Sequence, residues 1–401
     1  MNRRTFLATV GVGGAALTSG CQGLAGDDRL EWRFETGGSV TSVPAVDDGM
    51  VYTGSRDRSV YAIERDSGEE VWQFETDDGV AGSPTLAGDY LYVGSWDGHL
   101  YALDREAGTE QWAVDVGGYV GATPTIGERG DEGGEGGDGD EGGDGDEGGD
   151  GDEGGDGGEG GDRDVVYLGS GGRAVYAIDR FEGETLWTFE EPTDVVLSTA
   201  VVDPDRNRLY VGANDGTLYA IGTGGAGGTD GTGGTDGAGA GELAWKYRTG
   251  DAVNCTVALE EELVYFGSYD GAVYALDRET GDREWAFETG DRVQSSPTVA
   301  DGTVHVGSAD GSVYAIDRLT GEKEWTYDTG GTIYNSAPVL SGDTLYVGGA
   351  SGSGRVHALD RDSGEEKWQF DTDGTVHDSP TIAAGTLYVG SNDGHLYAVS
   401  I

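Results

Sequence analysis

The chain has 401 residues, of which 77 are glycine, and carries 75 acidic against 24 basic residues, for a formal net charge of -51. Because no basic stripe is available to neutralise phosphates, this composition excludes nucleic acid as an expected partner. A surface with one sign of charge repels itself unless salt screens it, so we expect the protein to work at high salinity, as haloarchaeal proteins do.

The first 21 residues have the features of an export signal. Arg3 and Arg4 stand before Thr5-Phe6-Leu7, as in a twin-arginine signal, and the apolar run that follows is too short and glycine-rich to span a membrane. Residues 17–21 resemble a lipobox that ends at Cys21. We therefore predict a signal over 1–21, a lipid on Cys21, a tether over 22–29 and an extracytoplasmic, membrane-anchored protein. Cys255 then has no partner for a disulfide.

Tryptophan recurs along the rest of the chain with a period of about 40 residues, which is typical of β-propeller blades. Two intervals are longer because low-complexity inserts interrupt them, at 129–163 and 222–242. The glycine-acid composition of the first insert cannot bury apolar surface, so we expect no folded structure there and no defined calcium site. The periodic residues are Trp32, Trp72, Trp112, Trp187, Trp245, Trp285, Trp325 and Trp368.

One uninterrupted unit, residues 293–329, shows the strands that each blade should contain. Alternating apolar residues predict strand A over 293–300, strand B over 303–307, strand C over 312–317 and strand D over 322–328. Gly311 falls in the tight turn between strands B and C, where a positive φ is expected.

The two ends of the chain predict how the ring closes. Residues 396–401 form a strand C that no strand D follows, whereas residues 30–34 form a strand D that no blade precedes. We therefore predict an all-β fold over residues 30–401. It is an eight-bladed β-propeller of four-stranded blades, closed by the N-terminal strand completing the last blade.

The link between strands C and D repeats Ala-x-Asp-x-x-Thr-Gly-x-x-x-Trp at 275–285 and 315–325, and with serine for threonine at 358–368. This motif closely resembles the tryptophan-docking motif of the quinoprotein (PQQ) dehydrogenase propellers and of the outer-membrane assembly lipoprotein family. The resemblance covers residues 30–401. It implies that each indole packs between adjacent blades, so we expect all eight periodic tryptophans to be structural.

The resemblance also raises an enzymatic alternative, a PQQ-dependent dehydrogenase. Such enzymes hold PQQ with calcium over the propeller axis, in a pocket walled by long inserts. This chain has no Cys-Cys pair and no Cys-x-x-Cys-His motif, and its inserts lack apolar residues. We therefore expect a non-catalytic, monomeric scaffold for cell-surface or envelope proteins. It should have no catalytic residue, no metal and no cofactor, and PQQ remains the alternative.

The residues that open each strand A should line the central channel. They are small or apolar in the first four blades and polar in the last four, where the candidates are Asn254, Gln294, Tyr334, Asn335, His377 and Asp378. Convergent polar groups in a concave site suit a ligand, so a ligand-binding or sensor module is a further alternative to a water-filled channel. Because neighbouring residues of a strand face opposite ways, we expect His377 and Asp378 to point apart.

The turns between strands B and C provide a third set of candidates. Trp96, which lies outside the tryptophan period, stands at one tip, and Arg56 and Tyr269 stand at two others. Exposed aromatic and arginine side chains are enriched at protein interfaces, so we predict a partner surface on this face. By topology, both inserts and the start of the first strand D should emerge from the opposite face, together with the tether.

Overall fold

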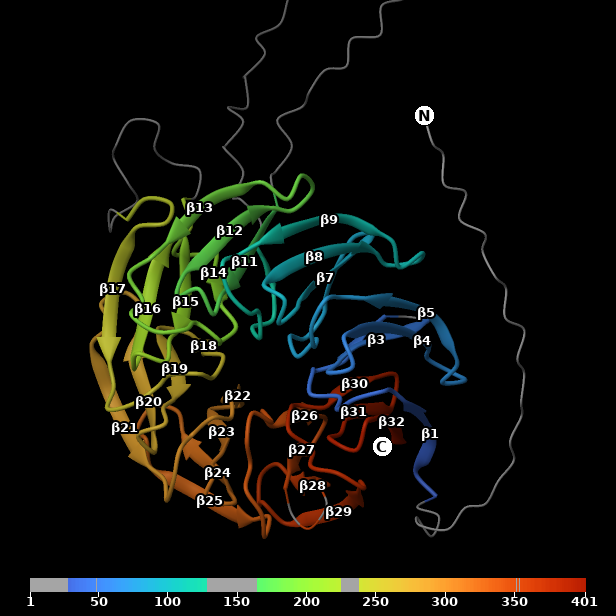
Figure 1. Ribbon diagram of the computed structural model, residues 1–401. Coiled ribbons are helices and arrows are strands. Elements are labelled where there is room, and N and C mark those ends of the chain that lie inside the picture. Colours follow the sequence, from blue (N-terminus) through green and yellow to red (C-terminus); the bar gives the residue numbers. More distant parts are fainter. Residues whose placement is uncertain (1–27, 48, 128–163, 225–237, 351, 353) are drawn as a thin grey trace, which may run out of the picture.

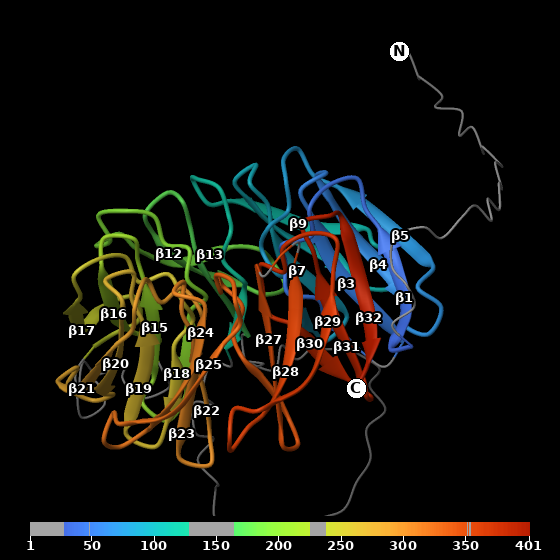
Figure 2. The same ribbon diagram turned by 90° about the horizontal axis from the view of Figure 1, so that it is seen from below.

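The computed structural model describes residues 28–47, 49–127, 164–224, 238–350, 352 and 354–401. Its strands form eight four-stranded antiparallel sheets, arranged as blades in a ring (Figure 1). Figure 2 shows the same ring edge-on, with the strands of neighbouring blades running between its two faces. None of the residues described forms a helix that could cross a membrane. The predicted signal, Cys21 and most of both predicted inserts lie outside the described residues.

Each blade runs from a short strand A near the axis to strand D at the rim. The first four blades contain, in order, β2 (Ala45–Val46), β3 (Met50–Ser55), β4 (Ser59–Glu64) and β5 (Glu70–Glu75); β6 (Thr85–Ala87), β7 (Tyr90–Gly94), β8 (His99–Asp104) and β9 (Glu110–Asp115); β10 (Thr125–Gly127), β11 (Val165–Gly169), β12 (Val175–Asp179) and β13 (Thr185–Phe189); β14 (Val201–Asp203), β15 (Arg208–Gly212), β16 (Thr217–Gly222) and β17 (Leu243–Arg248).

The last four blades follow the same order. They contain β18 (Ala258–Glu260), β19 (Leu263–Gly267), β20 (Ala272–Asp277) and β21 (Arg283–Glu288); β22 (Thr298–Ala300), β23 (Thr303–Gly307), β24 (Ser312–Asp317) and β25 (Lys323–Asp328); β26 (Val339–Ser341), β27 (Thr344–Gly349), β28 (Arg355–Asp360) and β29 (Glu366–Asp371); β30 (Thr381–Ala383), β31 (Thr386–Gly390), β32 (His395–Ser400) and β1 (Leu30–Glu35).

The ring closes between the two ends of the chain, as the sequence predicts. Strand β1 pairs antiparallel with β32, placing Trp32 opposite Ala398 and Phe34 opposite Leu396. Figure 1 shows this pair as the blue β1 beside the red β32. The eighth blade is thus built from residues more than 350 positions apart, since Thr36 Oγ1 also donates to the Gly394 carbonyl at |i−j| = 358.

Strand A is much shorter than expected, whereas the other strands of the unit 293–329 match closely. Strand C is confirmed at 312–317 and strand B at 303–307, but β22 begins only at Thr298. The preceding residues are held away from a ladder with strand B. The Val293 amide donates to the Ser268 carbonyl of the preceding blade at 2.9 Å, and Ser295 Oγ accepts from the Gly307 amide at 3.1 Å. Pro297 has no amide hydrogen with which to extend the ladder.

The apolar core lies between blades. In one cluster, Val304, Val306 and Ile316 of the sixth blade pack against Tyr265 and Trp285 of the fifth. A four-stranded sheet exposes two apolar faces, so each blade needs a neighbour on both sides to bury them. Ring closure gives every blade those two neighbours.

Except at the closing contact of the ring, each docking tryptophan joins one blade to the C–D turn of the next. The Trp285 indole nitrogen donates to the Arg318 carbonyl at 2.9 Å, and the ring lies against Gly321. The turn itself is fixed by Asp317, whose Oδ1 accepts from the backbone amides of Thr320 and Leu319 at 2.8 and 3.0 Å. These bonds, that of Thr320 first, hold the pKa of Asp317 below its usual range.

The same indole bond recurs around the ring. The pairs are Trp32 with Arg65 O, Trp72 with Arg105 O, Trp112 with Arg180 O, Trp245 with Arg278 O and Trp325 with Arg361 O. At the closing contact, β32 and β1 are the two ends of the chain and no turn joins them. There, Arg29 lies over the Trp368 ring, with its Cζ 4.5 Å from the ring centroid.

Substitution of Gly321 should reduce the stability of this scaffold strongly. Its φ is +71°, and a Cβ built on it would lie 2.9 Å from the Trp285 ring. Gly342 is the matched control because its φ is +61° and a Cβ there would meet nothing within 4 Å. We expect Gly342→Ala to cost about 1 kcal/mol through the left-handed backbone alone. Gly321→Ala should cost roughly 1–3 kcal/mol more through overpacking.

The measurement is the midpoint of thermal unfolding of both variants at the same high salt concentration. A larger fall for Gly321→Ala than for Gly342→Ala is expected. Equal falls would mean that backbone conformation, and not contact with the indole, makes glycine necessary in the motif.

Candidate functional site

The segments that precede the strands A surround a cavity on the axis of the ring. Its volume is about 310 Å³, and all eight blades contribute to its lining. The lining residues are Thr41, Val43, Arg56, Ala81, Ser83, Trp96, Tyr119, Gly121, Thr123, Leu197, Thr199, Asn254, Thr256, Tyr269, Gln294, Ser296, Asn335, His377, Asp378 and Ser379. Every candidate for the channel except Tyr334, and every candidate for the partner surface, lies in this one set.

The cavity has two chemically different halves. The first four blades supply small or apolar side chains such as Ala81 and Leu197, whereas the last four supply amides, an imidazole and a carboxylate. Threonine and serine hydroxyls, Thr256 and Ser296 among them, lie two residues further along most of these segments, whereas the first blade has Val43 at this place. A molecule in the cavity would therefore meet mostly small and apolar side chains together with the Arg56 guanidinium on one side, and amide, imidazole and carboxylate groups on the other.

A tyrosine and two amides form the first polar cluster. The Asn254 and Gln294 amide nitrogens both donate to the Tyr269 hydroxyl oxygen, at 3.1 and 2.7 Å. That hydroxyl keeps its own hydrogen for a further acceptor. The Asn254 Oδ1 atom is buried and has no hydrogen-bond partner, which is costly for a polar atom. The cluster thus has one donor, the Tyr269 hydroxyl, and one acceptor, Asn254 Oδ1, that are not used by its own hydrogen bonds.

A histidine forms the second polar cluster. The Tyr334 ring stacks on the His377 ring at a centroid distance of 4.9 Å and an angle of 7°. His377 Nδ1 lies 3.5 Å from both Asp378 Oδ2 and Asn335 Nδ2, which are long contacts. The expectation that His377 and Asp378 point apart is wrong, because both line the cavity. The physical reason is that β30 begins only at Thr381, so residues 377 and 378 do not follow the alternation of a strand.

The third cluster lies on the apolar side and joins the two surfaces that were predicted separately. The Arg56 guanidinium lies over the Trp96 ring, with Cζ 4.8 Å from its centroid, and Arg56 Nε donates to Thr41 Oγ1 at 3.3 Å. Tyr119 stands beside them and is 41% exposed. The B–C turns of the first, second and fifth blades therefore reach the cavity, where their tips form part of its rim.

Sequence reasoning missed Tyr119 on this rim and Arg292, which contacts the rim residue Tyr269. Tyr119 precedes strand A of the third blade by the same offset as the exposed Arg292, whose guanidinium lies 5.7 Å from the Tyr269 ring centroid. Both stand directly before the buried valine that opens each inner segment. Aligning the eight repeats on that valine would have drawn attention to them.

The lining residues do not suit the cofactor of the enzymatic alternative. Within the part of the chain that the structure describes, no three His, Cys, Asp or Glu side chains gather to hold a metal ion. One carboxylate, Asp378, and one cation, Arg56, line the cavity. A calcium ion is coordinated by six to eight oxygen ligands. PQQ is a tricarboxylate, so its binding needs more positive charge than Arg56 alone supplies.

Comparison with known proteins agrees with this architecture. The family model described as outer membrane protein assembly factor BamB matches residues 24–130, 137–226, 236–353 and 330–401. The crystal structure of BamB from Moraxella catarrhalis is similar, with a TM-score of 0.69 and 20% identity over 93% of this chain and 99% of that chain. The computationally designed protein Ika8 has a TM-score of 0.68 and 15% identity over 93% and 98%. At these identities, the two structures show a shared fold. No curated protein sequence matches the chain significantly.

Cys255 follows Asn254 but belongs to the scaffold. Its Sγ accepts from the Gly267 amide at 3.1 Å and donates to the Gly267 carbonyl at 3.3 Å. Serine hydroxyls accept the equivalent amide bond elsewhere, in the pairs Ser42–Gly54, Ser198–Gly212, Ser295–Gly307 and Ser336–Gly348. Burial raises the pKa of the thiol to about 12, so it is protonated in the folded protein.

We therefore expect Cys255→Ser to change the free energy of unfolding by about 1 kcal/mol or less, since it restores the usual residue. Cys255→Ala should cost roughly 1–3 kcal/mol because the Gly267 amide loses its acceptor. Thermal unfolding of both variants measures this. In the folded wild-type protein, Cys255 should not react with a thiol reagent, and rapid labelling of the native state would contradict the assignment.

Proposed function

Because this chain belongs to the family described as outer membrane protein assembly factor BamB, we propose that it is an extracytoplasmic, membrane-anchored scaffold for other envelope or cell-surface proteins, and not a catalyst. The observation that carries this proposal is the rim of the central cavity. Arg56, Trp96, Tyr119 and Tyr269 lie around an opening to which all eight blades contribute. Tryptophan, tyrosine and arginine are the residue types that dominate the binding energy of protein interfaces.

The scaffold is suited to presenting this rim rigidly. In most blades the B–C turn is fixed by an aspartate that bonds both its own strand C and the segment that follows the preceding blade. Asp270 Oδ2, for example, accepts from the Tyr274 hydroxyl and from the Gly250 amide, both at 2.8 Å. A partner therefore meets side chains that are already in place, so that binding costs little ordering of the platform.

The topology supports an orientation in which this rim faces away from the membrane. Strand β1 begins at Leu30, which pairs with Val399 near the end of β32. Strands β10 and β16 end on the same face of the ring, at Gly127 and Gly222, where the two inserts follow. A tether from Cys21 would then approach the face opposite to the cavity rim, and two acyl chains would hold it stably.

Site-specific photo-crosslinking tests the scaffold proposal. A photoreactive residue at Trp96 should form adducts with one or a few envelope proteins in native membranes at high salt. The control position is Leu319, which is 62% exposed in a C–D turn on the opposite face. If Trp96 is an interface anchor, Trp96→Ala should weaken recovery of the same partner by about 30-fold, the loss of roughly 2 kcal/mol typical of a hot spot. Identical adducts from positions 96 and 319, or none at 96, would refute the proposed surface.

Cell fractionation tests the anchor independently. Cys21→Ser removes the proposed lipid attachment site, so we expect the protein to move from the membrane to the soluble fraction. Cys255→Ser is the matched control and should remain with the membrane, because Cys255 is buried inside the fifth blade. Membrane retention of Cys21→Ser at the level of this control would remove the lipid anchor from the proposal and leave the cavity rim untouched.

A further inference from the structure

A tyrosine in strand B completes the contact between neighbouring blades at four places around the ring. Its hydroxyl donates to the same arginine carbonyl that receives the docking indole. The distances are 3.3 Å for Tyr52 to Arg105, 3.1 Å for Tyr92 to Arg180, 3.0 Å for Tyr210 to Arg278 and 3.2 Å for Tyr265 to Arg318. One carbonyl thus takes two hydrogen bonds from the preceding blade, and the phenol fills the space between the blades.

The sixth blade departs from this rule because His305 stands in place of the tyrosine. The imidazole occupies the usual ring position, 5.7 Å from the Trp325 centroid, where Tyr265 lies 5.9 Å from Trp285. The shorter side chain has no hydroxyl to reach the next blade. His305 is only 1% exposed, yet neither of its ring nitrogens has a hydrogen-bond partner. The Arg361 carbonyl keeps its bond from the Trp325 indole, at 3.0 Å.

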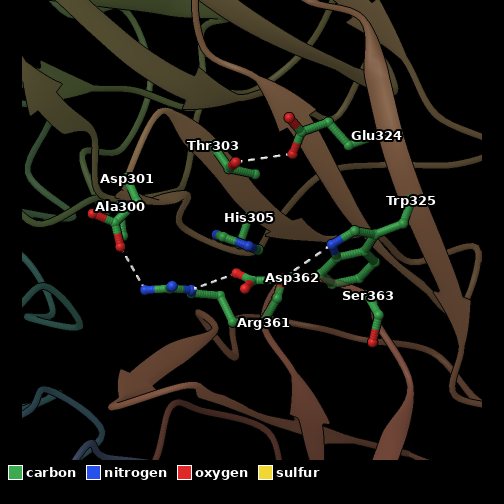
Figure 3. Close-up of a pocket in the computed structure, with 9 residues that line it drawn as sticks. All are labelled: Ala300, Asp301, Thr303, His305, Glu324, Trp325, Arg361, Asp362 and Ser363. Carbon is green, nitrogen blue, oxygen red and sulfur yellow. Dashed lines mark hydrogen bonds and ion pairs between the residues drawn. The ribbon is translucent and has the colours of Figure 1, made fainter.

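A cavity of about 560 Å³ opens beside His305, between the sixth and seventh blades. We call it the inter-blade pocket, and its lining residues are Ala300, Asp301, Thr303, His305, Glu324, Trp325, Arg361, Asp362 and Ser363. Figure 3 shows the His305 ring in the middle of these residues, with no dashed line reaching it. The volume is in the range of small-molecule sites.

The walls of the inter-blade pocket are already partly paired. Arg361 forms ion pairs with Asp301 at 2.5 Å and with Asp362 at 3.0 Å, and Glu324 Oε2 accepts from Thr303 Oγ1 at 2.9 Å. Three carboxylates against one guanidinium disfavour an anion. The carboxylates retain free lone pairs, so they can accept hydrogen bonds from neutral donors.

His305 and the Arg361 carbonyl together favour a ligand group that can both donate and accept a hydrogen bond. Burial lowers the pKa of His305, an effect that the nearby Arg361 backbone oxygen only partly opposes, so the imidazole is neutral and has one donor and one acceptor nitrogen. The Arg361 carbonyl lacks a second donor, whereas the equivalent carbonyls of Arg105, Arg180, Arg278 and Arg318 also accept from a tyrosine hydroxyl. A hydroxyl group meets both needs, because it accepts from the imidazole N–H and donates to the carbonyl. An ammonium group has no acceptor to offer.

We propose that the inter-blade pocket is a binding site for a sugar or a related neutral polyol. One ligand hydroxyl takes the place of the missing tyrosine hydroxyl between His305 and the Arg361 carbonyl. The carboxylates of Glu324 and Asp301 accept hydrogen bonds from further ligand hydroxyls. The free sugar and a sugar unit of a larger glycan share this chemistry.

Titration of the full-length protein with D-glucose, trehalose and maltotriose at high salt tests the site, with the imidazole NMR signals of His305 as the readout. We expect saturable binding with a dissociation constant on the order of 1–10 mM for at least one of them, as is usual for a few neutral hydrogen bonds. Tighter binding of maltotriose than of glucose would indicate a glycan, and the reverse would indicate a free sugar.

His305→Tyr is the decisive variant because it fills the pocket with the residue that the other blades use. It should keep the fold, raise or maintain the thermal midpoint, and weaken sugar binding by about 10-fold or more, as expected when a ligand loses its buried polar partners. Tyr265→Phe is the matched control, since it removes a hydroxyl from the neighbouring contact between blades and should leave binding unchanged.

Glu324→Gln provides a second variant at an exposed wall residue, where folding is not at risk. It should reduce binding several-fold, because a carboxylate is the stronger acceptor for a sugar hydroxyl. Three outcomes would overturn the proposal. They are no saturable binding of any of the three sugars up to about 100 mM, a concentration well above the expected range; equal binding by His305→Tyr; and His305-dependent binding of arginine amide, which would make the pocket a cation site.

Discussion

The contact between a tryptophan and the glycine turn of the next blade is the interaction on which this molecule depends. It combines a hydrogen bond, as from Trp285 to the Arg318 carbonyl, with close packing that leaves no room for a side chain at Gly321. Each blade buries its apolar faces only against its neighbours, so stability is approximately a sum of contacts between blades. That arrangement makes the ring tolerant of change within one blade and sensitive to change at these turns.

Because the contacts between blades provide most of the stability, the residues of the inner segments can differ from one blade to the next. The first four blades place Ala81 and Leu197 on the axis, while the last four place Asn254 and His377 there, without a change in strand order. A symmetric scaffold thus carries an asymmetric cavity. The same logic applies to His305, where a single departure from the repeat opens a pocket while the backbone pairing of β23 and β24 continues unbroken.

The fold was accessible from the sequence because its signals are repeated. Tryptophan spacing, the C–D motif and the unpaired strands at the two ends together predicted eight blades and their closure. Strand A was overestimated because Val293 and Ser295 have strand-like neighbours, although the Val293 amide bonds Ser268 of the preceding blade and the Ser295 hydroxyl bonds the Gly307 amide at the end of strand B. The alternation of apolar and polar residues along the sequence does not show which hydrogen-bond partners these residues have.

The candidate site was accessible only in part. Topology placed the polar residues of blades five to eight on the axis, but nothing in the spacing showed that Trp96 and Arg56 lean inward to meet them. The orientation of His377 and Asp378 was also mistaken, since it depended on a strand that begins four residues later. The exceptional character of His305 emerges only when its column in the eight repeats is compared with the tyrosines around it.

The closure of the ring has a mechanical consequence. Seven blades are continuous in the chain, whereas the eighth is held to its last strand, β1, by hydrogen bonds to β32 and by the contacts of Trp32 and Arg29. Any load applied through the segment before residue 30 therefore falls first on this non-covalent junction. Pulling on that segment would open the circle at this junction, so the force that the β1–β32 pair withstands would set the force that the whole ring can bear.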